Sequence, residues 1–193
     1  MDTYDIILDA ETRFAKEVAL GVIYQQQPSA WYYLVPGMFI IDYLRRGTAI
    51  SRYTKHFMFP RKLALDASRS LMKGQEKSEI ESRIESDVGH WLSGLKLHSQ
   101  ELLQSQKRAI DLLIEHYLKL QNAEGDSINE LIENSYRSRG AYESHVRELT
   151  SAEADIDRAI IESIANNEKL IEKLQLEARQ VEMVRKKIIE NIF

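Results

Sequence analysis

The sequence contains no cysteine and has only three prolines and eight glycines in 193 residues. Without cysteine, disulfide bonds, thiolate metal ligands and a cysteine nucleophile are excluded. Because prolines and glycines are so few, the chain has few helix breaks and tight turns, and residue types that favour helices, such as Leu, Ile, Glu, Lys and Ala, make up much of it. The composition therefore predicts an all-α protein.

Long hydrophobic runs are also missing. No stretch of about 18 consecutive apolar residues occurs, and the first ten residues, MDTYDIILDA, are acidic where a secretory signal would be basic. We therefore expect a cytoplasmic protein without an ordinary spanning helix. Any association with a membrane would then take place at its inner face.

The motifs of common catalytic and cofactor sites are absent as well. The sequence has no Gly-rich phosphate loop, no HExxH and no GxSxG. Its five histidines are scattered, and the nearest match to the ExxH element of di-metal helical bundles is Asp87 to His90. We expect no enzymatic activity, no metal and no cofactor, and the sequence identifies no small-molecule substrate.

Charge is distributed unevenly along the chain. Residues 1–30 have two basic and five acidic side chains, residues 31–75 have eight and two, and residues 76–193 have 16 and 23. The formal charges of the three segments are therefore −3, +6 and −7. A basic block between acidic flanks predicts either an anionic partner surface or a contact with the acidic part of the same chain.

The most densely apolar stretch, WYYLVPGMFIIDYL, covers residues 31–44. As a helix it would be about 21 Å long, short of the roughly 30 Å hydrocarbon core of a bilayer, and Pro36 and Gly37 interrupt it. It cannot span a membrane, but it has the composition of an interfacial element. We define the apolar wedge as Trp31, Tyr32, Tyr33, Leu34, Met38, Phe39, Ile40 and Ile41.

Positive charge follows the wedge directly. We define the basic collar as Arg45, Arg46, Arg52, Lys55, Arg61 and Lys62. Aromatic side chains settle at the lipid headgroup level, and cations next to them attract anionic lipid. This order predicts a non-enzymatic peripheral membrane protein that acts as a helical scaffold or adaptor, with a protein partner as a further possibility.

Two other interpretations stay open. If the wedge is buried against the apolar face of Phe14, Val18 and Val22, the protein is a soluble structural or oligomerisation module. If the collar acts together with aromatic neighbours such as Tyr53 and Phe57, it pairs phosphate contacts with base stacking, as in nucleic-acid binding. The acidic sequence pI of about 5.8 argues against nucleic acid as the partner.

Residues 1–75 are expected to form a cluster of short helices. Apolar residues at intervals of three and four mark the first helix, Pro60 suits the first turn of another, and Gly74 suits a helix stop. The expected helices are 5–26, about 38–46 with a joint at Gly47 or a continuation to about 57, and 61–73.

Residues 76–193 are expected to form a long antiparallel helical hairpin of the coiled-coil type. The first limb would begin at a capping box of Ser78 and Glu81 and continue to about Leu120, which gives about 40 residues and about 60 Å. The chain would then turn at 123–127, where Gly125 suits a left-handed helix cap.

The return limb is expected to start at a second capping box, Ser127 with Glu130. Thr150 with Glu153 is a further match to the same pattern. The limb is therefore either one long helix or two.

The end of the chain carries two apolar rows with a seven-residue spacing. From them we define the apolar seam as Ile160, Ile164, Ile171, Leu174, Val181 and Ile188. Asn167 and Arg185 are polar exceptions in these rows that can fix the register. Such a stripe packs either within its own chain or against a second copy, and a two-helix hairpin leaves about half of it uncovered, so we expect a homodimer.

Overall fold

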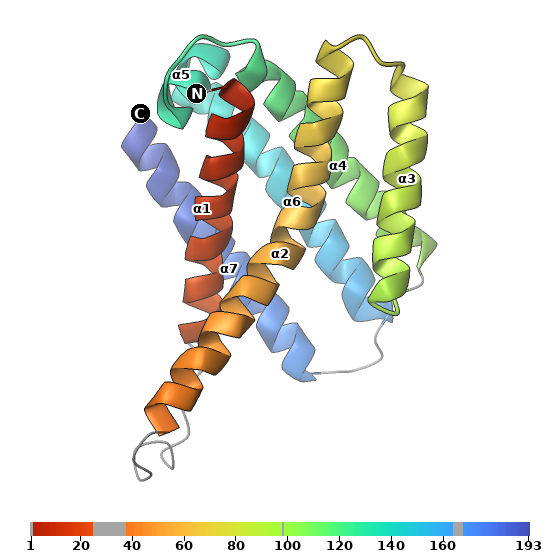
Figure 1. Ribbon diagram of the computed structural model, residues 1–193, viewed down its shortest axis with the longest axis vertical. Coiled ribbons are helices and arrows are strands. Elements are labelled where there is room, and N and C mark those ends of the chain that lie inside the picture. Colours follow the sequence, from red (N-terminus) through yellow and green to blue (C-terminus); the bar gives the residue numbers. More distant parts are fainter. Residues whose placement is uncertain (1, 25–37, 98, 164–167) are drawn as a thin grey trace.

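The computed structural model describes residues 2–24, 38–97, 99–163 and 168–193, with the backbone alone for 38–46, 169 and 170. Seven helices and no strand occur in these residues, which confirms the all-α prediction (Figure 1). The helices are α1 (Thr3–Tyr24), α2 (Met38–Met72), α3 (Lys77–Gly94), α4 (Gln100–Gln121), α5 (Ile128–Tyr136), α6 (Arg139–Ser163) and α7 (Glu168–Ile192).

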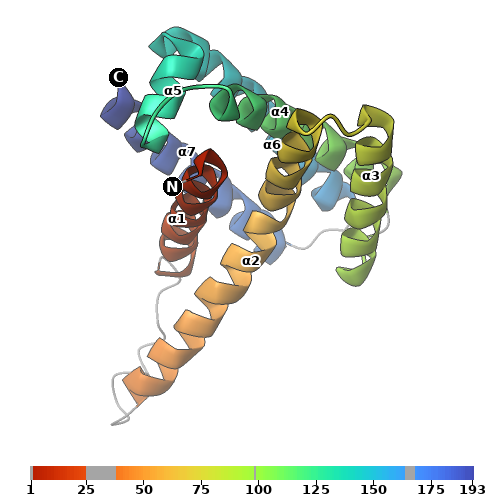
Figure 2. The same ribbon diagram turned by 45° about the horizontal axis from the view of Figure 1, so that its top comes forward.

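Five of the helices form a closed ring. α1 contacts α2, α2 contacts α4, α4 contacts α6, α6 contacts α7, and α7 contacts α1 again. α3 lies outside the ring against α2 and α4, and α5 lies across one end, where it contacts α1, α4, α6 and α7 (Figures 1 and 2). The start of α1 and the end of α7 both lie at this α5 end. Helices from both expected parts of the chain, 1–75 and 76–193, thus contribute to one ring.

The apolar faces of the helices meet inside the ring. The main core extends from α1 to α7, and wholly or almost wholly buried side chains such as Leu65, Ile110 and Tyr117 lie in it. A smaller cluster forms between α1 and α7, where Phe14 and Val18 pack with Val181. The main core therefore contains buried residues from both expected parts of the chain, 1–75 and 76–193.

α2 is one 35-residue helix, with no joint at Gly47 and no new start at Pro60. The prediction of a separate helix beginning at Pro60 is wrong. A proline inside a helix leaves the carbonyl four residues earlier without its N–H donor, and here that residue, His56, is exposed. Packing of Phe59 on Trp91 of α3, with ring centroids 4.8 Å apart, supports the helix beside the proline.

The limb expected as one helix of about 40 residues is divided into α3 and α4. α3 ends in a Schellman motif, in which Lys96 adopts a left-handed φ of 61° and the Leu97 N–H donates to the Leu92 carbonyl at 3.0 Å. Ser99 then caps α4 by accepting from the Leu102 N–H. Glycine is the usual signal for the left-handed position, so a lysine there gives no warning in the sequence.

Of the other predicted helix stops and starts, two are confirmed. Gly74 has a left-handed φ of 82° and ends α2, and the Ser127 hydroxyl accepts from the Glu130 N–H at the start of α5. The prediction that Gly125 is left-handed is wrong, because Gly74 is the one glycine with positive φ among the described residues. Gly125 instead lies too close to the Glu130 side chain to accept a Cβ without displacement.

The other two predicted capping boxes do not form. α3 begins at Lys77 after Glu76, whose side chain makes no capping hydrogen bond, so Ser78 lies inside the helix. Thr150 lies in the middle of α6, where its hydroxyl donates to the Val146 carbonyl at 2.8 Å. The return limb instead breaks at Arg137, which has a φ of 58° and separates α5 from α6. Together with α7, the described part of the chain after residue 127 therefore contains three helices.

Exchanging residues at the two left-handed positions should change stability in opposite directions. Gly74→Ala places a side chain at φ 82° and should lower the free energy of unfolding by about 1 kcal/mol. Lys96→Gly removes the strain of a side chain at φ 61° and should raise the free energy of unfolding by up to about 1 kcal/mol. Urea denaturation followed by circular dichroism measures both changes.

The control for this pair is Gly89→Ala in the middle of α3, where an added Cβ meets open space. This variant should be more stable by about 0.5–1 kcal/mol because alanine is the better helix former. If Lys96→Gly destabilised the protein as much as Gly74→Ala, the Schellman geometry at Lys96 would be refuted.

Candidate functional site

The first half of α2 projects from the bundle. Its N-terminal end extends beyond the ends of α1 and α7 in both views (Figures 1 and 2). Gly47, Thr48 and Ala49 are exposed, and α2 joins the core at Tyr53 and Phe57, which pack in the cluster between α1 and α7. Residues 38–52 at 1.5 Å per residue make this projection about 22 Å long.

The structure divides the basic collar into two groups. Arg61 is 5% exposed, and its guanidinium donates to Glu11 at 3.3 Å and to Glu153 at 3.1 Å. Lys62 is exposed but pairs with Asp66 at 2.7 Å. The prediction that Arg61 belongs to an exposed basic cluster is therefore wrong. Arg61 lies on the buried face of α2 with Leu65, because a run of cations along a helical sequence passes from one face of the helix to another.

Two cations of the collar have no ion-pair partner among the described residues: Arg52, at the end of the projection, and Lys55, one helical turn further along α2. Both side chains are exposed. They border a shallow depression of about 590 Å³, together with Gly47, Thr48, Ser51 and His56. α2 has no acidic residue between Asp42 and Asp66, so the positive charge of this face is not compensated from its own helix.

Arg45 and Arg46 precede this face by about two helical turns, in the part of α2 whose side chains are not described. The wedge residues Trp31, Tyr32, Tyr33 and Leu34 lie outside the described residues. Its remaining members, Met38, Phe39, Ile40 and Ile41, form the first turn of α2, again with the backbone alone described. The wedge therefore stays a prediction, as does its contact with lipid.

Three of the five described residues of the apolar seam pack against the protein's own core. Val181 is 7% exposed and packs against Phe14 and Val18 of α1, and Ile160 and Ile188 pack at the edge of the core. Ile171 and Leu174 are half-buried, and Ile164 lies outside the described residues. Packing within the chain thus accounts for the buried seam residues, and the homodimer stays a prediction.

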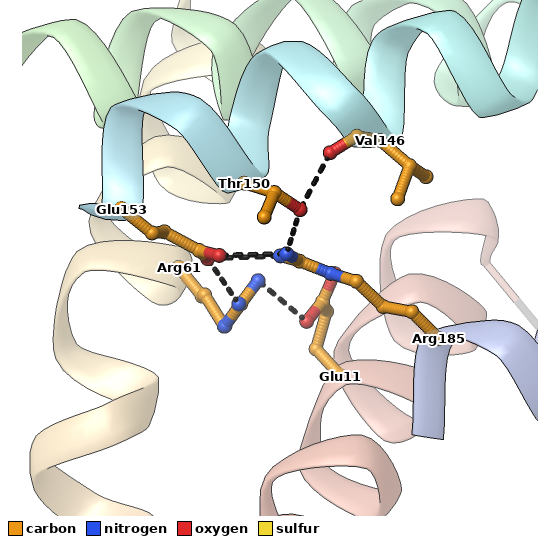
Figure 3. A network of polar contacts seen from close by, with 6 residues as sticks. All are labelled: Glu11, Arg61, Val146, Thr150, Glu153 and Arg185. Carbon is orange, nitrogen blue, oxygen red and sulfur yellow. Dashed lines mark hydrogen bonds and ion pairs between the residues drawn. The ribbon is translucent and has the colours of Figure 1, made fainter. Parts of the chain in front are cut away.

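A network of charged side chains occupies the interior of the ring (Figure 3). Arg185 of α7 binds Glu153 of α6 through two hydrogen bonds of 2.6 and 2.8 Å, and donates to Thr150 at 2.8 Å. Glu153 also accepts from Arg61 of α2, which reaches Glu11 of α1. Two arginines and two glutamates from four ring helices thereby neutralise one another.

The fifth ring helix, α4, places Tyr117 near the network: this side chain is fully buried, and its hydroxyl has no hydrogen-bond partner among the described residues. Burial and the nearby Glu11 raise the pKa of the Tyr117 hydroxyl well above its usual value. Burial alone would lower the pKa of the Arg61 guanidinium, but Glu11 and Glu153 outweigh it and raise that pKa. Both groups therefore keep their ordinary protonation states near neutral pH.

Sequence reasoning found one member of this network. Arg185 stood out as a polar residue in an apolar row, which is a signal of a buried partner. Glu11, Arg61 and Glu153 were missed because each belongs to a common surface pattern: charge on an amphipathic helix, a cationic run and a capping box. Only the packing of α1, α2 and α6 around Arg185 brings them together.

Removing the central carboxylate should destabilise the protein strongly. Glu153→Gln leaves Arg185 and Arg61 buried with one carboxylate between them, so we expect the free energy of unfolding to fall by about 3 kcal/mol, as for a broken buried ion pair. The same urea experiment on Lys62→Met, which removes an exposed pair, should show a loss below about 1 kcal/mol. Similar small losses in both variants would show that the network contributes little.

A second group of acids lies between α6 and α7. Burial, followed by Asp157 and Glu153, raises the pKa of Glu177 to about 7. Burial and Glu153 raise the pKa of Asp157 to about 6. Glu177 is therefore about half protonated near pH 7, and Asp157 takes up its proton about one pH unit lower.

This proton uptake gives a pH dependence with a defined sign. The pKa of Glu177 is higher in the folded protein than the usual value of about 4.3 in an unfolded chain, so the folded state takes up the proton first and becomes more stable as pH falls through about 7. As pH falls from about 8 to about 5, the unfolding free energy of the wild type should therefore rise relative to that of Glu177→Gln, which cannot take up this proton. Glu182→Gln, exposed on the same helix, is the matched control and should show no such trend, and a flat difference for Glu177→Gln would contradict the raised pKa.

Other kinds of site are not found in the described part of the chain. None of its helices contains a segment long and apolar enough to cross a membrane. Within the same residues, no three histidine, aspartate or glutamate side chains are placed to share a metal ion. No family model, curated protein sequence or solved structure matches the chain. The unpaired basic face of α2 is therefore the feature on which a function can be argued.

Proposed function

We propose that the protein is a non-enzymatic peripheral membrane protein. The first half of α2 binds an anionic lipid surface at the inner face of the membrane, and the helical bundle serves as a scaffold or adaptor there. One observation carries this proposal: Arg52 and Lys55 are exposed and have no ion-pair partner among the described residues, whereas Arg61 is paired in the interior and Lys62 pairs with Asp66 on the surface.

The charge distribution of the whole chain supports the same orientation. Residues 38–55 contain four basic and one acidic side chain, a formal charge of +3, which leaves −7 for the rest of the chain out of a total of −4. An anionic surface attracts the projecting end and repels the bundle. The positive end of the α2 helix dipole lies at Met38, so it adds to this attraction.

The binding strength would come from two moderate contributions. Each basic residue near an anionic membrane contributes about 1 kcal/mol, and Arg45, Arg46, Arg52 and Lys55 are the four available on this half of α2. The apolar wedge precedes them in the chain and would add insertion at the acyl boundary. A cationic patch or a short apolar element alone gives marginal binding, whereas the two together give a stable anchor.

Reversing the charge of the projecting face should weaken vesicle binding. We expect the wild type to co-sediment with vesicles of anionic and neutral phospholipid, with binding that falls as salt is raised. Arg52→Glu with Lys55→Glu should reduce this binding at least about tenfold. Lys73→Glu with Arg83→Glu, at exposed positions outside the projecting half of α2, changes the net charge equally and should alter binding less than about twofold.

Two outcomes would replace the proposal. Absence of binding to anionic vesicles would favour a soluble structural module in which the wedge is part of the core. Salt-sensitive binding to RNA or DNA without binding to vesicles would favour the nucleic-acid interpretation. Equal losses in the two double variants would mean that overall charge, and not the α2 face, determines binding.

A further inference from the structure

Two buried histidines face each other beneath α5. His116 of α4 and His145 of α6 are stacked, with ring centroids 4.8 Å apart and an angle of 18° between the ring planes. Both side chains are less than one tenth exposed. Tyr136 of α5 and Tyr142 of α6 complete the cluster, with their centroids 5.1 Å apart.

The hydrogen bonds of this cluster suit neutral imidazoles. His116 Nδ1 lies 2.7 Å from the Tyr136 hydroxyl oxygen, so one hydrogen bond joins α4 to α5. The buried Nε2 of His145 has no hydrogen-bond partner among the described residues. A protonated imidazole needs an acceptor for each of its two N–H groups, and His145 lacks one for Nε2.

The surrounding charges also oppose protonation. Lys119 on α4, Arg61 on α2 and Arg185 on α7 are the cations that face His116, and the Lys119 ammonium lies 5.2 Å from the centre of the Tyr136 ring. The nearby carboxylates of Glu11 on α1 and Glu153 on α6 are bound to the arginines, while Glu115 and Glu148 act on Tyr136. Burial, His145 and these cations lower the pKa of His116 well below its usual value, and burial lowers that of His145 to about 4.

This cluster is one of the contacts that hold α5 on the bundle. α5 has nine residues, too few for a helix that is stable alone in water. Leu131 and Ile132 anchor its buried face, the Ser135 hydroxyl donates to the Lys119 carbonyl at 3.1 Å, and Tyr136 supplies its last buried contact against the histidines. The larger interfaces of α2 and α4 do not involve α5, so α5 can open without them.

We propose that the His116–His145–Tyr136 cluster is an acid-sensitive latch that holds α5 across the end of the ring and releases it when the imidazoles are protonated. Protonation places two like charges within one stacked pair and leaves N–H groups without acceptors. Swinging α5 outward hydrates both rings and separates Tyr136 from Lys119. The latch depends on the α5 end of the bundle and not on lipid binding by α2.

Hydrogen exchange on the full-length protein tests this proposal. We expect the protection factors of residues 128–136 to fall at least tenfold between about pH 7 and about pH 4, while those of buried residues in α2 and α4 change less. His145→Phe keeps a stacked ring without a titrating group, so the opening of α5 should move to lower pH. His90→Phe, exposed on α3, is the matched control and should leave the opening unchanged.

Three results would overturn the latch. α5 and α4 could lose protection together, which would indicate global acid unfolding. His145→Phe could open at the same pH as the wild type. If that variant does not fold, imidazole signals in the NMR spectrum of the wild type decide: His116 and His145 titrating near the usual pKa of about 6.5, with α5 still protected, would refute the proposal.

Discussion

The salt-bridge network inside the ring is the interaction on which the rest of the structure depends. Arg185 and Arg61 would each be costly as isolated charges in an apolar interior, so each requires a carboxylate at a fixed place. Glu153 serves both arginines and Glu11 completes the set. Because these side chains come from α1, α2, α6 and α7, a shift of any of the four helices along its axis would leave a buried charge without its partner.

The same constraint gives α2 its two different halves. Its second half is fixed by Arg61 and by the buried row that includes Leu65, whereas its first half leaves the bundle. One continuous helix therefore joins a rigid anchor to an exposed, positively charged arm. A flexible joint at Gly47 would have left the direction of that arm undefined, but the helix passes through this position unbroken.

The sequence predicted those features that depend on local chemistry. The all-α class, the presence of the first helix, the stop at Gly74 and the cap at Ser127 each follow from propensity, periodicity or capping within a few residues. The break at Lys96 was missed because its left-handed residue is not a glycine. Arg61 was misplaced because charge along a sequence does not reveal which side of a helix it occupies.

The pairing of His116 with His145 lay beyond any local signal. The two residues are 29 positions apart on different helices, and neither stands in a recognisable motif. The same holds for Glu11 and Arg61, which meet because α1 and α2 pack side by side. Sequence periodicity tells which face of a helix is buried, but the identity of the facing helix comes from tertiary packing.

The start of α1 and the end of α7 lie together at the α5 end, far from the projecting tip of α2 (Figure 1). A fluorescent protein or a purification handle joined to either end would therefore sit on the opposite side of the bundle from the N-terminal end of α2. The two termini are equivalent attachment points in this respect. A label at either one would report the position of the molecule while leaving its basic arm unobstructed.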